Sequence, residues 1–469
     1  MNAAVTSREL VEVDDLRIGM FIHLDMNWMS HPFPLGSFRI ANTEQIATIR
    51  SLGVQRVRWS PTQSDPQLET TGWGRATDFD RLAPKASEEA ASSSIGAALP
   101  AGEADAAQHQ QDAAAAAAAA AIAAIVESPE VAARNRHRRA LAAQRAAQQL
   151  CERQFNEAAR DCKQLTDLVQ GKPKEARQQA EALSKALVEK MLGDQDMCIR
   201  LLTDAAGDKA ALHAMNVTVI ALLMGRSFGL SEADLMDLGV GAMLHDIGKL
   251  DLPDRVRHRD DQFSGAEVRF YEEHVSHGVG HARKMGLSPG AMLVIAQHHE
   301  HADGSGFPLK LNTDRMSAAA RIVALVNRYD NLCNPHLVAK ALTPHESLSL
   351  LFAQGKTKYD TAILGAFIRM MGVYPAGSTV QLTDDRYAIV VGVNSSRPLK
   401  PRVLVHEPKV PREEALIVDL EKTHGLGIRR SIKPMQLPVA SLEYLAPRPR
   451  VAYFFEAVPH DAADPAGAA

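Results

Sequence analysis

Cysteine is scarce in this sequence of 469 residues, which contains only four. They are scattered without the close pairing that metal-binding cysteines show, at Cys151, Cys162, Cys198 and Cys333. This usage argues against a disulfide framework and predicts reduced thiols in a cytoplasmic protein.

Long hydrophobic runs are also lacking. The longest apolar stretch, residues 113–126, is mostly alanine and falls short of the roughly 20 residues that a membrane-spanning helix needs. Residues 1–13 carry charges and lack the apolar core of a secretory signal. We therefore expect a soluble, cytoplasmic protein without a membrane span, for which any membrane link would come through a partner.

The charge balance is nearly even, with 52 basic and 56 acidic residues and a net charge of −4. It gives no global reason to expect binding to a nucleic-acid polymer or to a membrane surface. The basic cluster at residues 134–139 is interpreted as a solvated helix face, with contact to acidic lipid or RNA as the alternative.

Hydrophobic periodicity predicts a mainly α protein with a small α+β part at one end and a β-rich part at the other. Residues 63–129 have almost no large apolar side chains, so they cannot bury enough surface to offset their ordering entropy. The expected order is an α+β module (1–62), a disordered Ala-rich linker (63–129), a helical connector (130–204), an all-helical region (205–372), a β-rich extension (373–460) and a disordered tail (461–469).

The adjacent pair His245–Asp246 is the chemically most informative feature of the chain. A neutral imidazole binds one cation, whereas an anionic carboxylate can bridge two, so the pair offers two unlike ligands from one turn. Lys249, four residues after His245, can reach a phosphate oxygen as a point charge. The alternative for Lys249 is a surface cation near a helix terminus.

Further histidines follow at wide, helix-compatible intervals, at His213, His274 and the pair His298–His299. On its own, His213 at the start of an apolar helix would more often be a core residue than a ligand. The run Asp303–Pro308 must turn sharply, because glycine tolerates positive φ and proline fixes its own. A tight loop after two histidines suits a substrate rim, although many helices end in such a loop, so only the combination of features is specific.

Together these motifs resemble the HD-GYP subgroup of the HD phosphohydrolase superfamily, over residues 205–372. The resemblance is carried by Leu244–Lys249 (LHDIGK), His298–Glu300 (HHE) and Asp303–Pro308 (DGSGFP), in which Gly-Phe-Pro stands for the signature Gly-Tyr-Pro. Residues 372–403 look like the C-terminal extension of the same architecture. Residues 10–60 resemble the small N-terminal domain often joined to HD-GYP modules, through Leu16–Met20, Trp28 and His31–Phe33.

The resemblance implies a metal-dependent phosphodiesterase that hydrolyses cyclic di-GMP to linear di-GMP, with further cleavage to GMP left open. Its two divalent ions would be iron or manganese, which mixed histidine and carboxylate ligation suits without excluding zinc. The implied ligands are His213, His245, Asp246, His274, His298, His299 and Asn327. The implied catalytic residues are Asp246 and Lys249, and the implied substrate-binding residues are Lys249, Asp303, Gly304, Gly306, Phe307 and Pro308.

Three positions depart from the family pattern. Asn327 stands where the family has an aspartate ligand, and replacing a carboxylate by a neutral amide predicts weaker metal binding. Lys209, four residues before His213, occupies a place where some three-metal members have a glutamate, so we favour two metals. Phe307 keeps the ring of the usual tyrosine and loses its hydroxyl.

Two other histidines, His277 and His281, share a helical face with His274. We prefer His274 as the ligand because Gly278 follows it and because its interval from His245 suits the family. The other two histidines are expected to be solvated.

Two functions from different classes are therefore open. One is a cyclic di-GMP phosphodiesterase of bacterial second-messenger signalling, with the N-terminal module and helical connector serving regulation or a homodimer. The other is a catalytically weakened HD-GYP protein that binds the nucleotide or a signalling protein as an adaptor, which Asn327 favours. A different HD-type phosphohydrolase acting on nucleotides is disfavoured by the Gly-Ser-Gly-Phe-Pro loop.

Overall fold

The structure is a computed structural model that describes residues 9–24, 37–40, 43–61, 64, 129–192, 196–202, 208–394 and 397–457. Apart from Ser64 and Pro129, the predicted linker lies outside these residues, as do the predicted tail, Trp28 and His31–Phe33. The chain divides into two compact units, residues 1–26 with 35–140, and residues 27–34 with 141–469.

The first unit contains a four-stranded antiparallel sheet in the order β1-β4-β2-β3. Alternating residues of β1 and β4, such as Val11 and Val57, are buried, as the period of a strand with one covered face requires. Gly19 turns the chain into β2 with a φ of 94°, a conformation that glycine adopts without steric strain. The elements are β1 (Glu9–Glu12), η1 (Val13–Asp15), β2 (Phe21–His23), β3 (Ser37–Arg39), α1 (Thr43–Ser51) and β4 (Arg56–Trp59).

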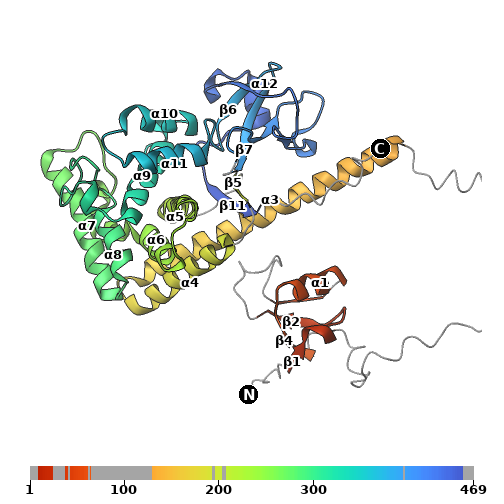
Figure 1. Ribbon diagram of the computed structural model, residues 1–469, viewed down its shortest axis with the longest axis horizontal. Coiled ribbons are helices and arrows are strands. Elements are labelled where there is room, and N and C mark those ends of the chain that lie inside the picture. Colours follow the sequence, from red (N-terminus) through yellow and green to blue (C-terminus); the bar gives the residue numbers. More distant parts are fainter. Residues whose placement is uncertain are drawn as a thin grey trace, which may run out of the picture. The chain divides into compact units, whose positions relative to one another are not determined.

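The second unit is mainly helical (Figure 1). Helix α3 (Pro129–Leu168) begins in the first unit and ends in the second. The other helices are α4 (Pro173–Met191), α5 (Lys209–Ser227), α6 (Glu232–Leu244), α7 (Gly265–Met285), α8 (Pro289–Gln297), α9 (Ala318–Cys333), α10 (Pro344–Gln354), α11 (Thr361–Met371) and α12 (Val439–Leu445), with short 3-10 turns η5 (Ile247–Asp251), η6 (Asp254–Val256), η7 (Thr313–Arg315), η8 (Val338–Lys340), η9 (Arg412–Glu414) and η10 (Pro434–Gln436).

Helix α5 is the central helix of this unit and packs against α6, α9 and strand β11 (Tyr453–Ala457), as Figure 1 shows with α5 viewed along its axis. Asp208 caps its N-terminus by accepting hydrogen bonds from the backbone N–H groups of Ala210 and Ala211. Among the described residues, α5 is the one helix long and apolar enough to cross a membrane, yet 67% of its apolar window is buried inside the protein. That burial is typical of a core helix.

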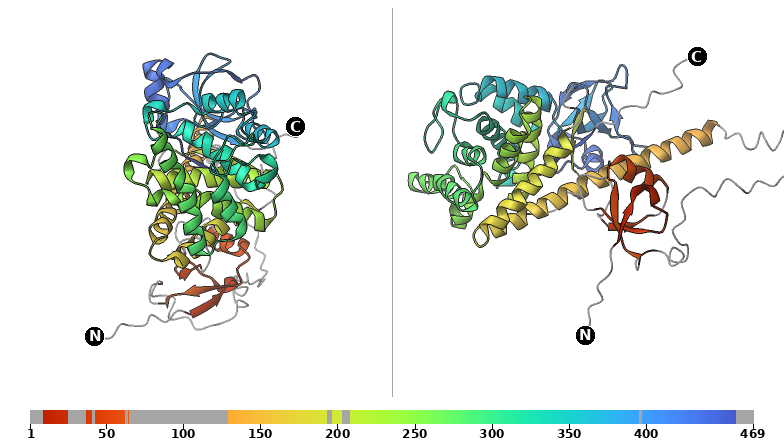
Figure 2. Two further views of the ribbon diagram at one scale, coloured as in Figure 1. Left: turned by 90° about the vertical axis from the view of Figure 1, so that its left-hand side faces the viewer. Right: turned by 60° about the horizontal axis from the view of Figure 1, so that its bottom comes forward.

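The unit also contains a seven-stranded antiparallel sheet in the order β10-β6-β7-β5-β11, with β8 paired to β7 and β9 paired to β8. Most of its strands are drawn in blue in Figure 2. Its strands are β5 (Met197–Leu201), β6 (Thr379–Leu382), β7 (Tyr387–Asn394), β8 (Arg402–Val405), β9 (Val418–Asp419), β10 (Ile428–Ser431) and β11. Six of these strands lie between residues 379 and 457, within the part of the chain where a β-rich extension was expected. The prediction of helix up to residue 204 is wrong at β5, because β7 and β11 pair with it on both sides.

Candidate metal centre

The His-Asp pair lies where α6 ends and η5 begins. His245 follows the last residue of α6, and Asp246 precedes the first residue of η5. Gly248 lets η5 pack directly on α7, because a Cβ there would lie 1.9 Å from the carbonyl oxygen of His274. Glycine is therefore required at this position to bring the pair and His274 together.

Three of the histidines are oriented by backbone carbonyls one helical turn earlier. A carbonyl can only accept, so each Nδ1 must carry the proton and each Nε2 presents a lone pair. These bonds run from His245 to Ala242 (2.7 Å), from His274 to Tyr271 (2.6 Å) and from His298 to Ile295 (2.8 Å).

The Asp246 carboxylate lies between two sets of these Nε2 atoms. On one side, its Oδ2 lies 3.6 Å from His213 Nε2 and 3.5 Å from His245 Nε2. On the other side, its Oδ1 lies 3.7 Å from His274 Nε2 and 3.6 Å from His298 Nε2. His299 joins the second set, so the structure brings together six of the seven predicted ligands.

The donor set fits divalent cations. Two neutral imidazoles that turn their Nε2 lone pairs toward each other repel, yet His213 and His245 do so at 3.2 Å, and His274 and His298 at 3.3 Å. Within the described residues, Asp246 Oδ1 and His299 Nε2 are moreover buried atoms without a hydrogen-bond partner. A cation in each set would bind these lone pairs.

The electrostatic environment keeps the donors in the protonation states that metal binding requires. Burial lowers the pKa of His274 to about 3 and lowers the pKa of His245 and of His299, so these rings are neutral near pH 7. Burial acts to raise the pKa of Asp246, but the charge of Lys249 and the neighbouring imidazoles outweigh it and hold that pKa well below its usual value.

Lys249 lies within the centre and is not a surface cation. Its Nζ lies 2.6 Å from Asp246 Oδ2 and 5.6 Å from the centre of the Tyr271 ring. Burial acts to lower the pKa of Lys249, but the charge of Asp246 raises it above the ordinary value, so the ammonium is permanently charged.

The predicted loop after His298–His299 is anchored by the side chain of Glu300. This buried carboxylate accepts hydrogen bonds from the backbone N–H groups of Leu309 (2.6 Å) and Leu311 (2.8 Å). Gly306 passes so close to the preceding turn that a Cβ would lie 2.4 Å from the nitrogen of His301.

Phe307 consequently stacks on a predicted ligand, His299, with 4.5 Å between ring centres and 21° between ring planes. Elsewhere in the loop, the Asp303 carboxylate accepts a hydrogen bond from the backbone N–H of Ser305 (2.9 Å), and Gly304 adopts a φ of 77°. Asp303 and Pro308 are exposed. These residues form a rim beside the metal ligands, and their contact with substrate stays a prediction.

Asn327 is buried on α9, and its Oδ1 accepts a hydrogen bond from Asn331 Nδ2 at 2.6 Å. Its role as a ligand stays a prediction.

The sequence analysis assigned no positioning role to Asp330, whose Oδ2 lies 2.6 Å from His213 Nδ1. The spacing could have indicated such a role, because Asp330 lies three residues after Asn327 and therefore on the same face of the helix.

The choice of His274 over its neighbours agrees with the geometry, because His274 points into the cluster. The expectation that His281 is solvated is wrong. His281 is buried, and its Nε2 lies 2.8 Å from a carboxylate oxygen of Asp251, at the end of the turn that Gly248 allows to pack on α7. His277 lies at the surface of the same helix, with 36% of its side chain exposed.

Comparisons with known proteins agree with this geometry. A family profile described as HD domain matches residues 187–363, and one described as Domain of unknown function (DUF3391) matches residues 9–180. A cyclic di-GMP phosphodiesterase of Pseudomonas aeruginosa is 27% identical over 216 residues, which are 45% of this chain and 51% of that protein. The cyclic di-GMP phosphodiesterase response regulator RpfG of Xanthomonas campestris is 30% identical over 166 residues, or 35% of this chain and 43% of RpfG.

Residues 187–363 match the HD domain family, and the relatives named as cyclic di-GMP phosphodiesterases support the HD-GYP type within it. The resemblance seen in the sequence and the mainly α fold expected from it are confirmed. The chain covers about half of the P. aeruginosa relative and 43% of RpfG. A 3′3′-cGAMP-specific phosphodiesterase of Vibrio cholerae is 26% identical over 174 residues, which are 37% of this chain and 38% of that protein.

Proposed function

We propose that this protein is a metal-dependent phosphodiesterase that hydrolyses cyclic di-GMP to linear di-GMP in bacterial second-messenger signalling. The observation that carries the proposal is the position of Asp246, whose two carboxylate oxygens face two separate sets of imidazole Nε2 atoms. An HD domain and relatives that are named cyclic di-GMP phosphodiesterases support it.

Two divalent ions, iron or manganese, would be held by the two sets, with Asp246 shared between them. His213 and His245 form one set, and His274, His298 and His299 form the other, while Asn327 supplies an amide oxygen. When bound, such ions lower the pKa of a water molecule and offset the negative charge that develops on the phosphoryl oxygens.

The chain's own residues would position the phosphodiester. Lys249, charged and partly buried beside Asp246, donates its N–H groups to a phosphoryl oxygen and stabilises the charge that grows there in the transition state. The rim formed by Asp303, Gly304, Gly306, Phe307 and Pro308 borders the substrate, with the Phe307 ring as an apolar surface against which a base can lie.

A second function is favoured by Asn327. A neutral amide at a ligand position removes one negative charge from a centre of two dications, which weakens metal binding. Its Oδ1 moreover already accepts a hydrogen bond from Asn331. The alternative is a signalling adaptor that binds the cyclic dinucleotide or a protein partner with little turnover.

The remaining parts of the chain are assigned to regulation. The N-terminal α+β module and the helical connector would receive a signal or form a homodimer, and the β-rich extension would support the HD domain. We place the protein in the cytoplasm, where cyclic dinucleotide messengers act, with no nucleic-acid polymer among its partners.

The test uses the full-length chain, purified without oxygen and loaded with Fe²⁺ or Mn²⁺. Bound metal is counted, and cyclic di-GMP and 3′3′-cGAMP are offered separately while products are separated by chromatography. We expect linear di-GMP from the wild type, loss of metal and turnover together in Asp246→Ala, and wild-type behaviour in Asp314→Asn, which removes an exposed carboxylate of η7.

Binding of cyclic di-GMP by the metal-loaded wild type without hydrolysis would establish the adaptor instead. Preferential hydrolysis of 3′3′-cGAMP would keep the phosphodiesterase and replace its substrate. Full metal occupancy and rate in Asp246→Ala would show that the metal centre has been assigned to the wrong residues.

A further inference from the structure

His213 is oriented differently from the other imidazoles around Asp246. His245, His274 and His298 each donate Nδ1–H to a carbonyl three residues earlier in their own segment, so local helical structure fixes them. His213 instead directs Nδ1 at the Asp330 carboxylate, 117 residues away on α9, at 2.6 Å. Its orientation therefore depends on tertiary structure.

Asp330 is fully buried and has its other oxygen fixed by two asparagine side chains. Asn216, one turn after His213 on α5, donates from Nδ2 to Asp330 Oδ1 at 2.8 Å. Asn334, at the end of α9, donates to the same oxygen at 2.8 Å. A carboxylate with three donors around it has little freedom to turn.

Both asparagines are in turn fixed by the backbone of the segment Arg450–Tyr453, which leads into β11. Each donates its second Nδ2 hydrogen to the carbonyl oxygen of Val451, from Asn216 at 3.0 Å and from Asn334 at 2.9 Å. Asn216 Oδ1 accepts from the N–H of Tyr453 (3.0 Å), and Asn334 Oδ1 accepts from the N–H of Val451 (2.8 Å). Because a backbone N–H can only donate, these contacts also fix which way each amide faces.

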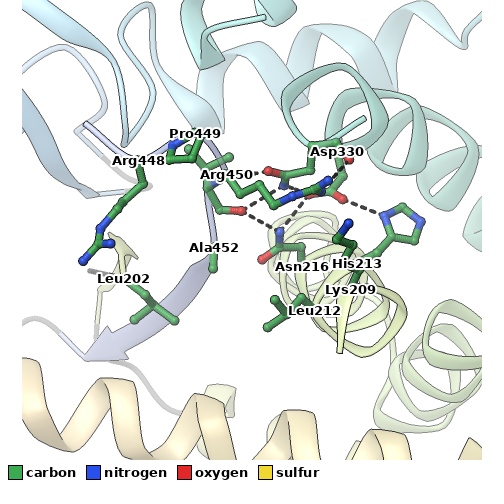
Figure 3. A pocket seen from close by; sticks show the side chains of 12 residues that line it. Leu202, Lys209, Leu212, His213, Asn216, Asp330, Arg448, Pro449, Arg450 and Ala452 are labelled. Atoms are coloured by element: carbon green, nitrogen blue, oxygen red, sulfur yellow. Dashed lines mark hydrogen bonds and ion pairs between the residues drawn. The ribbon is translucent and has the colours of Figure 1, made fainter. Parts of the chain in front are cut away.

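Arg450 attaches the same segment to α9 a second time. Its guanidinium donates to the carbonyl oxygens of Asn334 (3.3 Å), Pro335 (3.0 Å) and His336 (3.3 Å) just after the helix ends. His213, Asn216, Asp330 and Arg450 are among the residues that line a cavity of about 230 Å³. Figure 3 shows Asn216 and Arg450 between the β11 segment and His213.

We propose that the segment Arg450–Tyr453 is a structural part of the metal centre, acting through Asn216, Asn334 and Asp330 to hold His213 in its metal-binding orientation. Asp330 is accordingly a positioning residue for one of the two ions. The β-rich end of the chain thereby fixes the geometry of the His213–His245 set of ligands. The geometry of the His274–His298–His299 set does not depend on it.

This inference rests on the proposed two-metal centre, and its test measures metal binding without measuring hydrolysis. The full-length chain is stripped of metal, checked for folding by far-UV circular dichroism and titrated with Mn²⁺, and bound metal is counted by mass spectrometry. We expect two ions per wild-type chain. In Asp330→Asn, one ion should stay at wild-type affinity and the other should bind about 10–100-fold more weakly, because the amide cannot accept on both sides. It must turn its NH2 group either toward the donors of Asn216 and Asn334 or toward His213 Nδ1, and the second orientation moves the imidazole proton to the metal-binding Nε2.

Two further variants separate positioning from general stability. Tyr453→Phe removes the buried hydrogen bond between the hydroxyls of Tyr453 and Tyr329 (3.2 Å) but keeps every contact to Asp330, so it should lower stability and leave both metal affinities unchanged. Asn334→Ala keeps the His213–Asp330 contact and removes one of the two asparagines that connect Asp330 to Val451, so it should weaken the same single ion. This variant decides the question if Asp330→Asn fails to fold.

Wild-type affinity for both ions in folded Asp330→Asn or Asn334→Ala would overturn the inference and leave the proposed function standing. Equal weakening of both ions would also overturn it, because the two sets would not be independent. A wild type that binds no Mn²⁺ would overturn the proposed two-metal centre itself.

Discussion

Lys249 and Asp246 form a 2.6 Å ion pair within the metal centre, through the same carboxylate oxygen that faces His213 and His245. A cation bound by those two imidazoles would therefore share this oxygen with an ammonium group. Because like charges repel at such a distance, the ammonium would gain by turning to an anion, and the phosphodiester supplies one. The pair thus connects metal binding to substrate binding.

We predict that Lys249→Met lowers kcat/KM for cyclic di-GMP by about 100-fold, the size of effect seen when one donor to a developing oxyanion is removed. Metal content should not fall, because the substitution removes a positive charge that competes for Asp246. Steady-state kinetics with metal analysis on the same sample check both statements. Lys249→Arg keeps the positive charge, so its kcat/KM should fall less than that of Lys249→Met. Equal rates for wild type and Lys249→Met would contradict the role of Lys249.

Asn327→Asp tests whether the natural amide weakens the centre. Restoring a carboxylate adds an anionic oxygen beside two dications, so Mn²⁺ affinity should rise by about 10–100-fold, and turnover should rise wherever incomplete occupancy limits the wild type. The hydrogen bond from Asn331 can persist, since a carboxylate oxygen still accepts it. Mn²⁺ titration and cyclic di-GMP hydrolysis are the measurements.

Two results would change the interpretation of Asn327. Unchanged metal affinity and unchanged rate in Asn327→Asp would place this residue outside the centre. A silent wild type that becomes active through this one substitution would show that the natural protein is the adaptor.

Gly306→Ala tests the packing of the loop beside the metal ligands. The added methyl would lie 2.4 Å from the nitrogen of His301 and 2.5 Å from the carbonyl oxygen of His299, so the loop must move. We expect a loss of about 1–3 kcal/mol in the free energy of unfolding, as for other overpacked sites, together with lower turnover. Gly280→Ala is the control, because nothing lies within 4 Å of its Cβ on α7, and it should stabilise the protein slightly. Equal melting temperatures for the two variants would contradict the prediction.

The elements that the sequence predicted correctly have a local signal. The strands near Thr379 and Tyr387 are β-branched runs between turn residues, and the long helices show apolar periodicity. β5 has no such signal, because all five of its residues are buried and therefore do not alternate. Its conformation comes from pairing with β7 and β11, almost 200 residues or more along the chain.

The metal ligands could be found from the sequence because their motifs have characteristic neighbours and intervals. The residues that hold His213 could not, because Asp330, Asn216 and Asn334 are common polar residues whose significance depends on contacts more than 110 residues away. His281 was misjudged for the same reason, since its partner Asp251 belongs to another element.

Lys190 gives a prediction outside the metal centre. This lysine of α4 lies against the aromatic rings of β11, with Nζ 4.6 Å from the centre of the Phe454 ring, and it donates a hydrogen bond to Gln154. Burial lowers its pKa from 10.5 to about 8, although Cys151 and Glu456 act in the opposite direction.

Between about pH 8 and pH 10.5 the unfolded chain keeps the Lys190 proton that the folded protein has released. The unfolded state then binds more protons, so stability should rise with pH across this window, by at most about 3 kcal/mol in total. Below pH 8 both states are protonated and above pH 10.5 neither is, so the contribution of Lys190 is constant there. Urea unfolding followed by circular dichroism at several pH values, for wild type and Lys190→Met, isolates this residue by difference. Lys185→Met alters a lysine of α4 with 63% of its side chain exposed, and its free energy of unfolding should depend on pH as that of the wild type does. If the free energy of unfolding of Lys190→Met also depends on pH as that of the wild type does between pH 8 and 10.5, then Lys190 does not titrate in this range.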